Sequence, residues 1–198
     1  MSSENLYENS LKNRLKAFEL SESDQSQLAL DTHIPFQVAV VSNLLSISRD
    51  PIIRNLTDLD TRELRILVNI GSYGPIAASD IAYQSRLDPY SINRAIAALA
   101  KKELVKYEEG ASRSKPVLLT EQGNSIYNKV VAHLKMREEK LLDTLTNQER
   151  NTLSELLQKL ELNAEAVLAM EVADCQKQGL SVTRDHKELE RWYKRTNK

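Results

Sequence analysis

The stretch that most constrains the fold is a helix with a clear start at Asp88 and Pro89. A carboxylate at this position accepts hydrogen bonds from the free N–H groups of the first turn, and proline needs no such partner there. Ile92, Ile96 and Leu99 then recur at helical spacing, which defines one apolar face. The helix is therefore expected to pack by this face and to present polar side chains on the other.

The hydrophobic period changes from 3.6 to 2 immediately after this helix. Residues 104–107 and 117–119 are short β-like runs, separated by a polar segment that contains Gly110. Pro116 suits the start of an edge strand, because proline cannot donate to a β-ladder. The pattern predicts a β-hairpin with a long, charged loop.

Capping residues and apolar stripes predict further helices on both sides of this region. The first follows Asp31-Thr32-His33 and ends or bends near Pro51, and the second is opened by the capping box of Asp60 and Glu63 and stopped by Gly71 and Gly74 in left-handed turns. A short helix is expected over residues 78–85. Two longer helices follow the hairpin, one capped by Thr120 and one opened by the capping box of Thr146 and Glu149. A short helix, a tight turn, a capped helix and a hairpin in this order form a winged helix-turn-helix.

The predicted fold is mainly α with a small β-wing, in which a winged helix-turn-helix domain is combined with a helical dimerisation region. The leucine stripes of the flanking helices exceed what one small winged domain can cover, which favours a dimer. The expected parts are a polar N-terminal tail (1–30), an N-terminal helix of the dimerisation region (31–56), the winged domain (57–120), the C-terminal dimerisation helices (121–173) and a basic C-terminal tail (174–198).

Composition excludes several classes of protein. Cys175 is the only cysteine, so an internal disulfide and a multi-thiolate zinc site are excluded. No apolar run approaches the roughly 18 residues of a membrane span, and the polar N-terminus does not resemble a signal peptide. We therefore expect a cytoplasmic protein with no membrane partner.

Basic charge is concentrated in two segments although the net charge of the chain is −1. Residues 86–115 carry seven bases and four acids, a local charge of +3, and residues 176–198 carry seven bases and three acids, or +4. A basic strip on a near-neutral protein can bind nucleic acid, although either cluster alone is more often a solvated surface.

The polar side of the helix that starts at Pro89 carries side-chain types that can read DNA. The expected contacts are Pro89, Tyr90, Ser91, Asn93 and Arg94, because residues near the N-terminus of a recognition helix reach base edges in the major groove. Asn can read adenine and Arg can read guanine, whereas Ser91 suits a phosphate or water contact.

Residues 59–160 resemble the MarR family of winged-helix transcriptional regulators. The resemblance rests on these segments in combination: Arg62-Glu63-Leu64-Arg65-Ile66-Leu67, residues 78–81, Ser91-Ile92-Asn93-Arg94-Ala95-Ile96, residues 99–105, and Leu118-Leu119-Thr120-Glu121-Gln122-Gly123. It implies a homodimer with intertwined terminal helices that places two recognition helices on a pseudo-palindromic site in double-stranded DNA.

The resemblance also assigns roles in the wing. Arg113 stands at the family's wing arginine, but position 111 is Ala where an aspartate that holds the arginine is frequent. Lys115 is a second candidate for a phosphate contact. Asn93 stands where Ser or Thr is frequent before the arginine, which bears on base preference.

A small-molecule effector, often a phenolic or aromatic acid, is implied by the same resemblance. The candidate residues of its binding site are His33, Phe36, Val40 and Tyr73, although a histidine at a helix start is more often a cap. A ligand-relieved repressor is therefore the expected function.

Two other functions are weighed against this one. A winged-helix module that binds protein and no longer binds DNA is motivated by the near-neutral charge and the missing wing aspartate. An enzyme is not expected, because the sequence has no nucleophile elbow, phosphate loop or paired carboxylates, and its three histidines lack ligand spacing. No cofactor and no metal are predicted.

Overall fold

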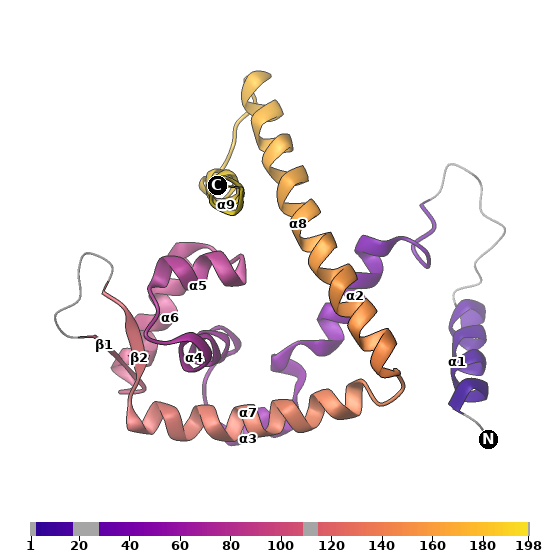
Figure 1. Ribbon diagram of the computed structural model, residues 1–198, viewed down its shortest axis with the longest axis horizontal. Coiled ribbons are helices and arrows are strands. Elements are labelled where there is room, and N and C mark those ends of the chain that lie inside the picture. The colour runs from indigo at the N-terminus through magenta and orange to yellow at the C-terminus, as the bar shows by residue number, and fades with distance from the viewer. Residues whose placement is uncertain (1–2, 18–27, 109–114, 198) are drawn as a thin grey trace. The chain divides into compact units, whose positions relative to one another are not determined.

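The computed structural model describes residues 3–17, 28–108 and 115–197 (Figure 1). The chain divides into two units, Met1–Pro51 and Ile52–Lys198, each of which is described by itself. The elements in chain order are α1 (Ser3–Ala17), α2 (Ile34–Leu45), the 3₁₀ turn η1 (Ile47–Arg49), α3 (Pro51–Leu56), α4 (Thr61–Tyr73), α5 (Ala78–Ser85), α6 (Pro89–Lys101), β1 (Val105–Tyr107), β2 (Val117–Leu119), α7 (Glu121–Leu141), α8 (Asn147–Lys177) and α9 (Arg184–Thr196).

The helix α2 begins where its cap predicts but ends earlier than expected. His33 is the N-cap, and its Nδ1 accepts a hydrogen bond from the backbone N–H of Phe36 at 3.4 Å. The helix ends at Leu45 because Ser46 has extended backbone angles (φ −53°, ψ 127°). Pro51 does not end this helix. It occupies the first position of α3, where a missing N–H costs nothing.

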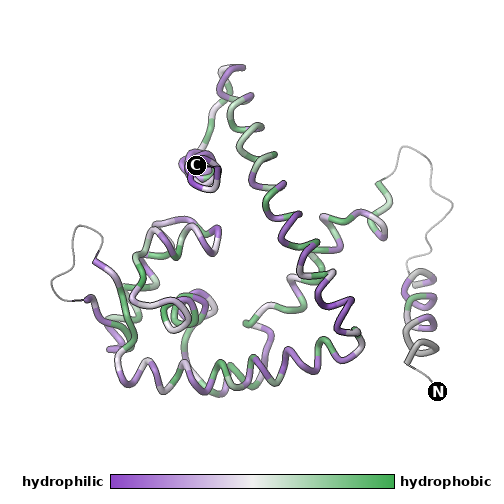
Figure 2. Tube along the Cα trace, viewed as in Figure 1, coloured by the Kyte–Doolittle hydropathy of each residue, from purple (hydrophilic) through white to green (hydrophobic). Residues whose placement is uncertain are grey.

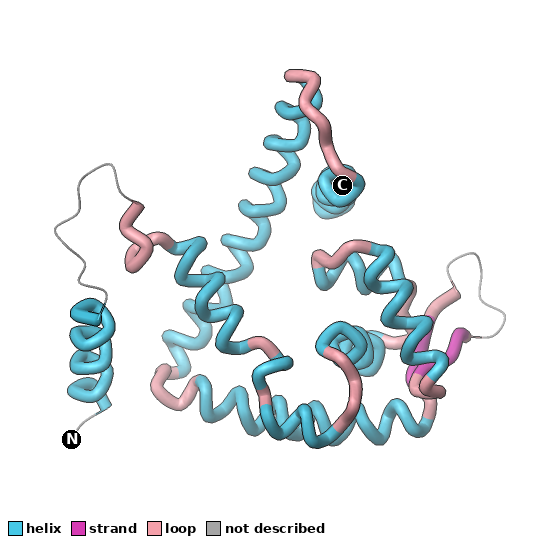
Figure 3. Tube along the Cα trace, turned by 180° about the vertical axis from the view of Figure 1, so that it is seen from behind, coloured by secondary structure: helices cyan, strands magenta, loops and turns pink. Residues whose placement is uncertain are grey.

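The core of the second unit is formed by α4, α5, α6 and the hairpin. The aliphatic side chains that are at most 2% exposed there are Leu64, Ile66, Leu67, Ile70, Ile81, Ala82, Ile92, Ile96, Leu99, Leu104 and Val117. β1 and β2 are antiparallel, with Lys106 opposite Leu118, and Ile76 bridges to Val117 on the other side. In Figure 3 the two strands are the magenta part of the chain. The predicted winged-helix order is therefore confirmed.

Gly71 and Gly74 do not stop α4 in left-handed turns, although the sequence predicts that they do. Gly71 is inside the helix, and a Cβ there would lie 2.3 Å from the Tyr127 ring of α7. Gly74 is the C-cap, but it is extended (φ −67°, ψ 150°) rather than left-handed. The following residue, Pro75, explains this, because proline disfavours helical angles in the residue before it.

Gly123 allows α7 to start against the hairpin. Thr120 caps the helix through a hydrogen bond from the Gly123 N–H to its Oγ1 at 3.1 Å, and this hydroxyl donates to the Glu103 carbonyl at 2.7 Å. A Cβ at Gly123 would lie 2.0 Å from the Leu104 carbonyl oxygen. Only glycine therefore fits at this crossing.

The C-terminal region contains one helix that was not predicted. Residues 174–198 were expected to be a basic tail, but α9 is opened by a capping box of Thr183 and His186. Its amphipathic face buries Trp192, which is 8% exposed, and α9 packs on α8. The prediction failed because the burial of α9 depends on contacts distant in sequence.

Two helices keep apolar surface exposed. No residue of α2 is buried, although the structure describes the whole helix. The exposed side chains of α8 include Leu153, Leu156, Leu157, Leu160 and Leu168. Green, apolar segments recur along both helices in Figure 2. Among the described residues, no helix is both long and apolar enough to cross a membrane.

Candidate nucleic-acid interface

The start of α6 is fixed by its cap. The Asp88 carboxylate accepts a hydrogen bond from the Ser91 N–H at 2.8 Å, and Pro89 occupies the first turn. Hydrogen bonds from the side chain and backbone of Ser91 lower the pKa of Asp88 below its ordinary value. The carboxylate therefore stays ionised beside the positive end of the helix dipole.

A tight turn brings α5 to α6. Arg86, the C-cap of α5, has a left-handed backbone (φ 51°), which bulky residues adopt only when other contacts hold them. Its guanidinium donates to the Tyr83 carbonyl and pairs with the Glu165 carboxylate of α8 at 3.0 Å. These contacts hold the turn of the helix-turn-helix.

The end of α6 is tied to the start of α4. The Lys102 ammonium pairs with the Glu63 carboxylate at 2.9 Å, and Glu63 also accepts the Asp60 N–H in its capping box. The hydrogen bond from Lys102 to Glu63 raises the pKa of the lysine. Together with the buried face of Ile92, Ile96 and Leu99, this pair fixes the direction of α6.

The five predicted contacts all lie in the first two turns of α6. Tyr90 is 64% exposed, and the Arg94 guanidinium lies 5.8 Å from the centre of its ring. Asn93 is exposed, and its amide donates to the Pro89 carbonyl at 2.8 Å. Ser91 is only half-buried and faces the cap. The structure therefore gathers Tyr90, Asn93 and Arg94 on one accessible polar face.

The wing is described in part. Arg113, like Ala111, lies outside the described residues. Lys115 is exposed and precedes β2. The hairpin that carries it follows α6 directly, as predicted.

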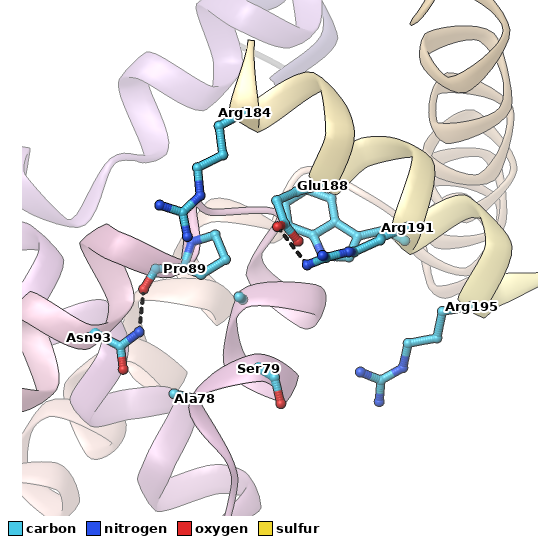
Figure 4. A pocket seen from close by; sticks show the side chains of 10 residues that line it. Ala78, Ser79, Pro89, Asn93, Arg184, Glu188, Arg191 and Arg195 are labelled. Atoms are coloured by element: carbon cyan, nitrogen blue, oxygen red, sulfur yellow. Dashed lines mark hydrogen bonds and ion pairs between the residues drawn. The ribbon is translucent and has the colours of Figure 1, made fainter. Parts of the chain in front are cut away.

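The helix α9 adds arginines beside α6, which sequence reasoning missed. A groove of about 410 Å³ is lined by the first turns of α5 and α6 and by one face of α9 (Figure 4). Its walls include Asn93, Arg184, Arg191 and Arg195. The local charge of +4 in residues 176–198 was the signal that could have found it.

The contacts of α9 fix its position on the helix-turn-helix. The Thr196 hydroxyl lies 2.7 Å from the Tyr83 hydroxyl of α5 and 3.1 Å from the Glu165 carboxylate. Arg195 pairs with Asp80 of α5 at 2.8 Å, and its guanidinium lies 4.4 Å from the centre of the Tyr83 ring. The helix is therefore anchored to α5 by several polar contacts.

The predicted effector residues fall in different units. His33 caps α2, Phe36 and Val40 follow on that helix, and Tyr73 ends α4 in the second unit. Phe36 and Tyr73 are exposed by 39% and 60%. Neither unit contains all four, so this ligand site stays a prediction. Among the residues described, no three His, Cys, Asp or Glu side chains are grouped as metal ligands.

The winged region of this chain matches a known protein family. Residues 59–109 match the family model of the MarR family. The predicted resemblance to the MarR family is confirmed. The matched MarR segment runs from the start of α4 to the wing and contains all five predicted contacts of α6. A search of curated proteins finds no relative.

Solved structures share the MarR fold at low identity. The transcriptional regulator SlyA is 22% identical with a TM-score of 0.60, and the match covers 67% of this chain and 94% of SlyA. A MarR/EmrR family transcriptional regulator from Acinetobacter sp. ADP1 is 22% identical with a TM-score of 0.64, covering 70% and 99%. CouR from Rhodococcus jostii RHA1, solved with p-coumaroyl-CoA bound, is 19% identical with a TM-score of 0.58, covering 68% and 95%. These likenesses confirm the fold class.

Proposed function

We propose that this chain is a MarR-type transcriptional regulator that binds a pseudo-palindromic operator as a homodimer. The observation that supports this best is the accessible polar face of Tyr90, Asn93 and Arg94 on a helix whose other face is buried. A rigid helix with such a face fits the major groove, and phosphate contacts from Lys115 and Arg113 would follow from the wing.

The homodimer is supported by the exposed apolar faces of α2 and α8. Large apolar patches on a soluble chain mark interaction surfaces. A second copy would cover both faces and set the distance between two recognition helices. We place this regulator in the cytoplasm, where DNA and a small ligand are both accessible.

Regulation is proposed as repression that a small aromatic acid relieves. CouR, which has a similar fold, was solved with p-coumaroyl-CoA bound, and the aromatic part of that ligand supports an aromatic effector for this chain. The residues proposed to contact this ligand are those named from the sequence, His33, Phe36, Val40 and Tyr73.

The test is selection of duplexes from a random pool, followed by affinity measurements at several salt concentrations. We expect one enriched palindromic motif and an affinity that falls steeply with salt, because phosphate contacts release counterions. Absence of an enriched motif and of salt-dependent binding would instead favour the protein-interaction module.

A further inference from the structure

We propose that α9 is an additional DNA-contacting element, which binds the phosphate backbone beside the recognition helix through Arg184 and Arg191. This inference rests on the proposed function and extends it to a helix that follows the predicted dimerisation helices.

The position of α9 makes its arginine face continuous with the proposed DNA surface. The groove between α9 and the helix-turn-helix has Pro89 and Asn93 on one side and Arg184 and Arg191 on the other. Figure 4 shows Arg184 and Pro89 among the residues that line this groove. A DNA strand that follows the recognition helix would therefore meet α9 next.

The charges on this face are available. Arg184 has no carboxylate partner among the residues that the structure describes, and it is exposed. Arg191 pairs with Glu188 of the same helix at 2.8 Å, but its side chain is 76% exposed. A guanidinium has five N–H donors, so the exposed part of Arg191 can bind a phosphate while the pair with the buried Glu188 remains.

The spacing of the two arginines suits a nucleic-acid backbone. They are seven residues apart, which places them on one face about 10 Å apart along the helix axis. One DNA strand presents a phosphate every 3.4 Å or so along its axis, so both guanidinium groups can reach one strand.

The floor of the groove adds hydrogen-bond donors. The N-cap of α5 is Ala77, which has no side-chain acceptor for the first-turn N–H groups of Ala78 and Ser79. In helix-turn-helix proteins the first helix crosses the DNA backbone. Open N–H groups beside arginines have the chemistry of a phosphate site, which agrees with the arginine face of α9.

The helix α9 does not cover the reading face of α6. Tyr90 keeps 64% of its surface exposed, and Arg94 is exposed as well. The contacts that anchor α9 go to Asp80 and Tyr83 of α5 instead. The arrangement therefore extends the DNA surface and leaves Tyr90 and Arg94 free, with Asn93 at the border between the two faces.

The test compares two double variants that remove equal charge from α9. Arg184→Ala/Arg191→Ala removes one unpaired and one paired base from the groove. Lys187→Ala/Lys194→Ala is the matched control, because both lysines lie outside the groove and Lys194 pairs with Glu190 at 2.5 Å. Affinity for a selected duplex and for a random duplex is measured by fluorescence anisotropy against NaCl concentration.

The arginine variant is expected to lower the slope of log K against log salt by about 1.8 per subunit, since each lost phosphate contact lowers it by about 0.9. The loss should be similar on both duplexes, and the lysine variant should stay near the wild type. Equal slopes for the two double variants would overturn the inference while leaving the proposed function intact. Tighter binding by the arginine variant would show that α9 occludes DNA and would also overturn it. A wild-type protein that binds neither duplex would reject both proposals.

Discussion

Asp88 fixes the first turn of the recognition helix by accepting the Ser91 N–H. The same hydrogen bonds lower the pKa of its carboxyl, which therefore binds its proton less readily in the folded protein than in the unfolded chain. A lowered pKa adds stability above the unfolded value, and this stability is lost as the pH falls through the folded value. The cap thus links the geometry of α6 to acid stability.

Replacing this cap should weaken folding measurably. Asp88→Ala is expected to lower the free energy of unfolding by about 1 kcal/mol, the usual cost of losing an N-cap. Asp88→Asn keeps an acceptor and should cost less near neutral pH. Urea unfolding at several pH values checks this, because the wild type should lose its advantage over Asp88→Asn as the pH falls below 3.8, the ordinary value of the group. A constant difference between the two proteins from pH 6 to pH 3 would contradict the role of the charge.

Arg94 is the residue with the sharpest expected effect on DNA reading. Arg94→Ala should cost about 1–3 kcal/mol on the selected operator and much less on random DNA, as expected for a base contact. Lys101→Ala, two turns further along the same face, is the control for a simple loss of charge. Equal losses on both duplexes would reassign Arg94 to phosphate binding.

The residues of α6 could be predicted because a cap and a helical period are local in sequence. Ser91, Asn93 and Arg94 follow Asp88 directly, so one correct helix start places all of them. The effector residues could not be tested in this way, because His33 and Tyr73 belong to different units and no local pattern relates them.

Two glycines show how closely the elements approach. A Cβ added at Gly123 would meet a backbone carbonyl, whereas a Cβ added at Gly71 would meet the Tyr127 side chain. A carbonyl in a hairpin cannot move without breaking the ladder, but a tyrosine ring can rotate away.

Gly123→Ala is therefore expected to be the more costly change, by about 3 kcal/mol or more, because it forces α7 away from β1. Gly71→Ala should cost less, and in a Tyr127→Ala background it should stabilise by up to about 1 kcal/mol, since alanine is the better helix former. Chemical unfolding of the wild type, the three single variants and the double variant measures these differences. A Gly71→Ala cost that persists without the tyrosine ring would show that the ring is not the obstacle.

The elements that the sequence predicts have local signals, whereas the helix that it misses is stabilised by contacts with distant parts of the chain. Capping boxes at Asp60 and Thr146 and the change of period after α6 are local, and the structure has each. The helix α9 has a low apolar content, and its capping box uses His186 where Glu or Gln is usual. Its burial depends on α5 and α8, which no local pattern reveals.

For the whole molecule, the exposed apolar faces predict that the folded chain is a dimer at micromolar concentration. Sedimentation should show one species of twice the chain mass. Leu157→Asp places a charge in the stripe of α8 and should shift the protein towards monomer, while Gln158→Asp, on another face of α8, should not. A monomer that dominates in the wild type would reject the two-half-site arrangement.

The proposed ligand control is a property that would depend on the whole proposed dimer. Both recognition helices must lie about 34–36 Å apart to enter successive turns of the major groove. A ligand that relieves repression must bind the arrangement with the wrong spacing more tightly, because equal affinity for both arrangements shifts nothing. A small molecule held near Tyr73 could change the spacing without touching DNA.

Thermodynamic linkage allows this mechanism to be tested by measuring the affinities of aromatic acids, with benzoate as the simplest and larger acids beside it. If a compound weakens operator binding, operator DNA must weaken binding of that compound by the same factor. A coupling of about 1–3 kcal/mol corresponds to roughly 5–150-fold in both directions. Calorimetric titration of each compound into free protein and into the protein–operator complex gives the two affinities, and Tyr73→Ala should reduce the first of them. A compound with identical affinity in both titrations is not an inducer, however tightly it binds, because it cannot distinguish the two arrangements of the dimer.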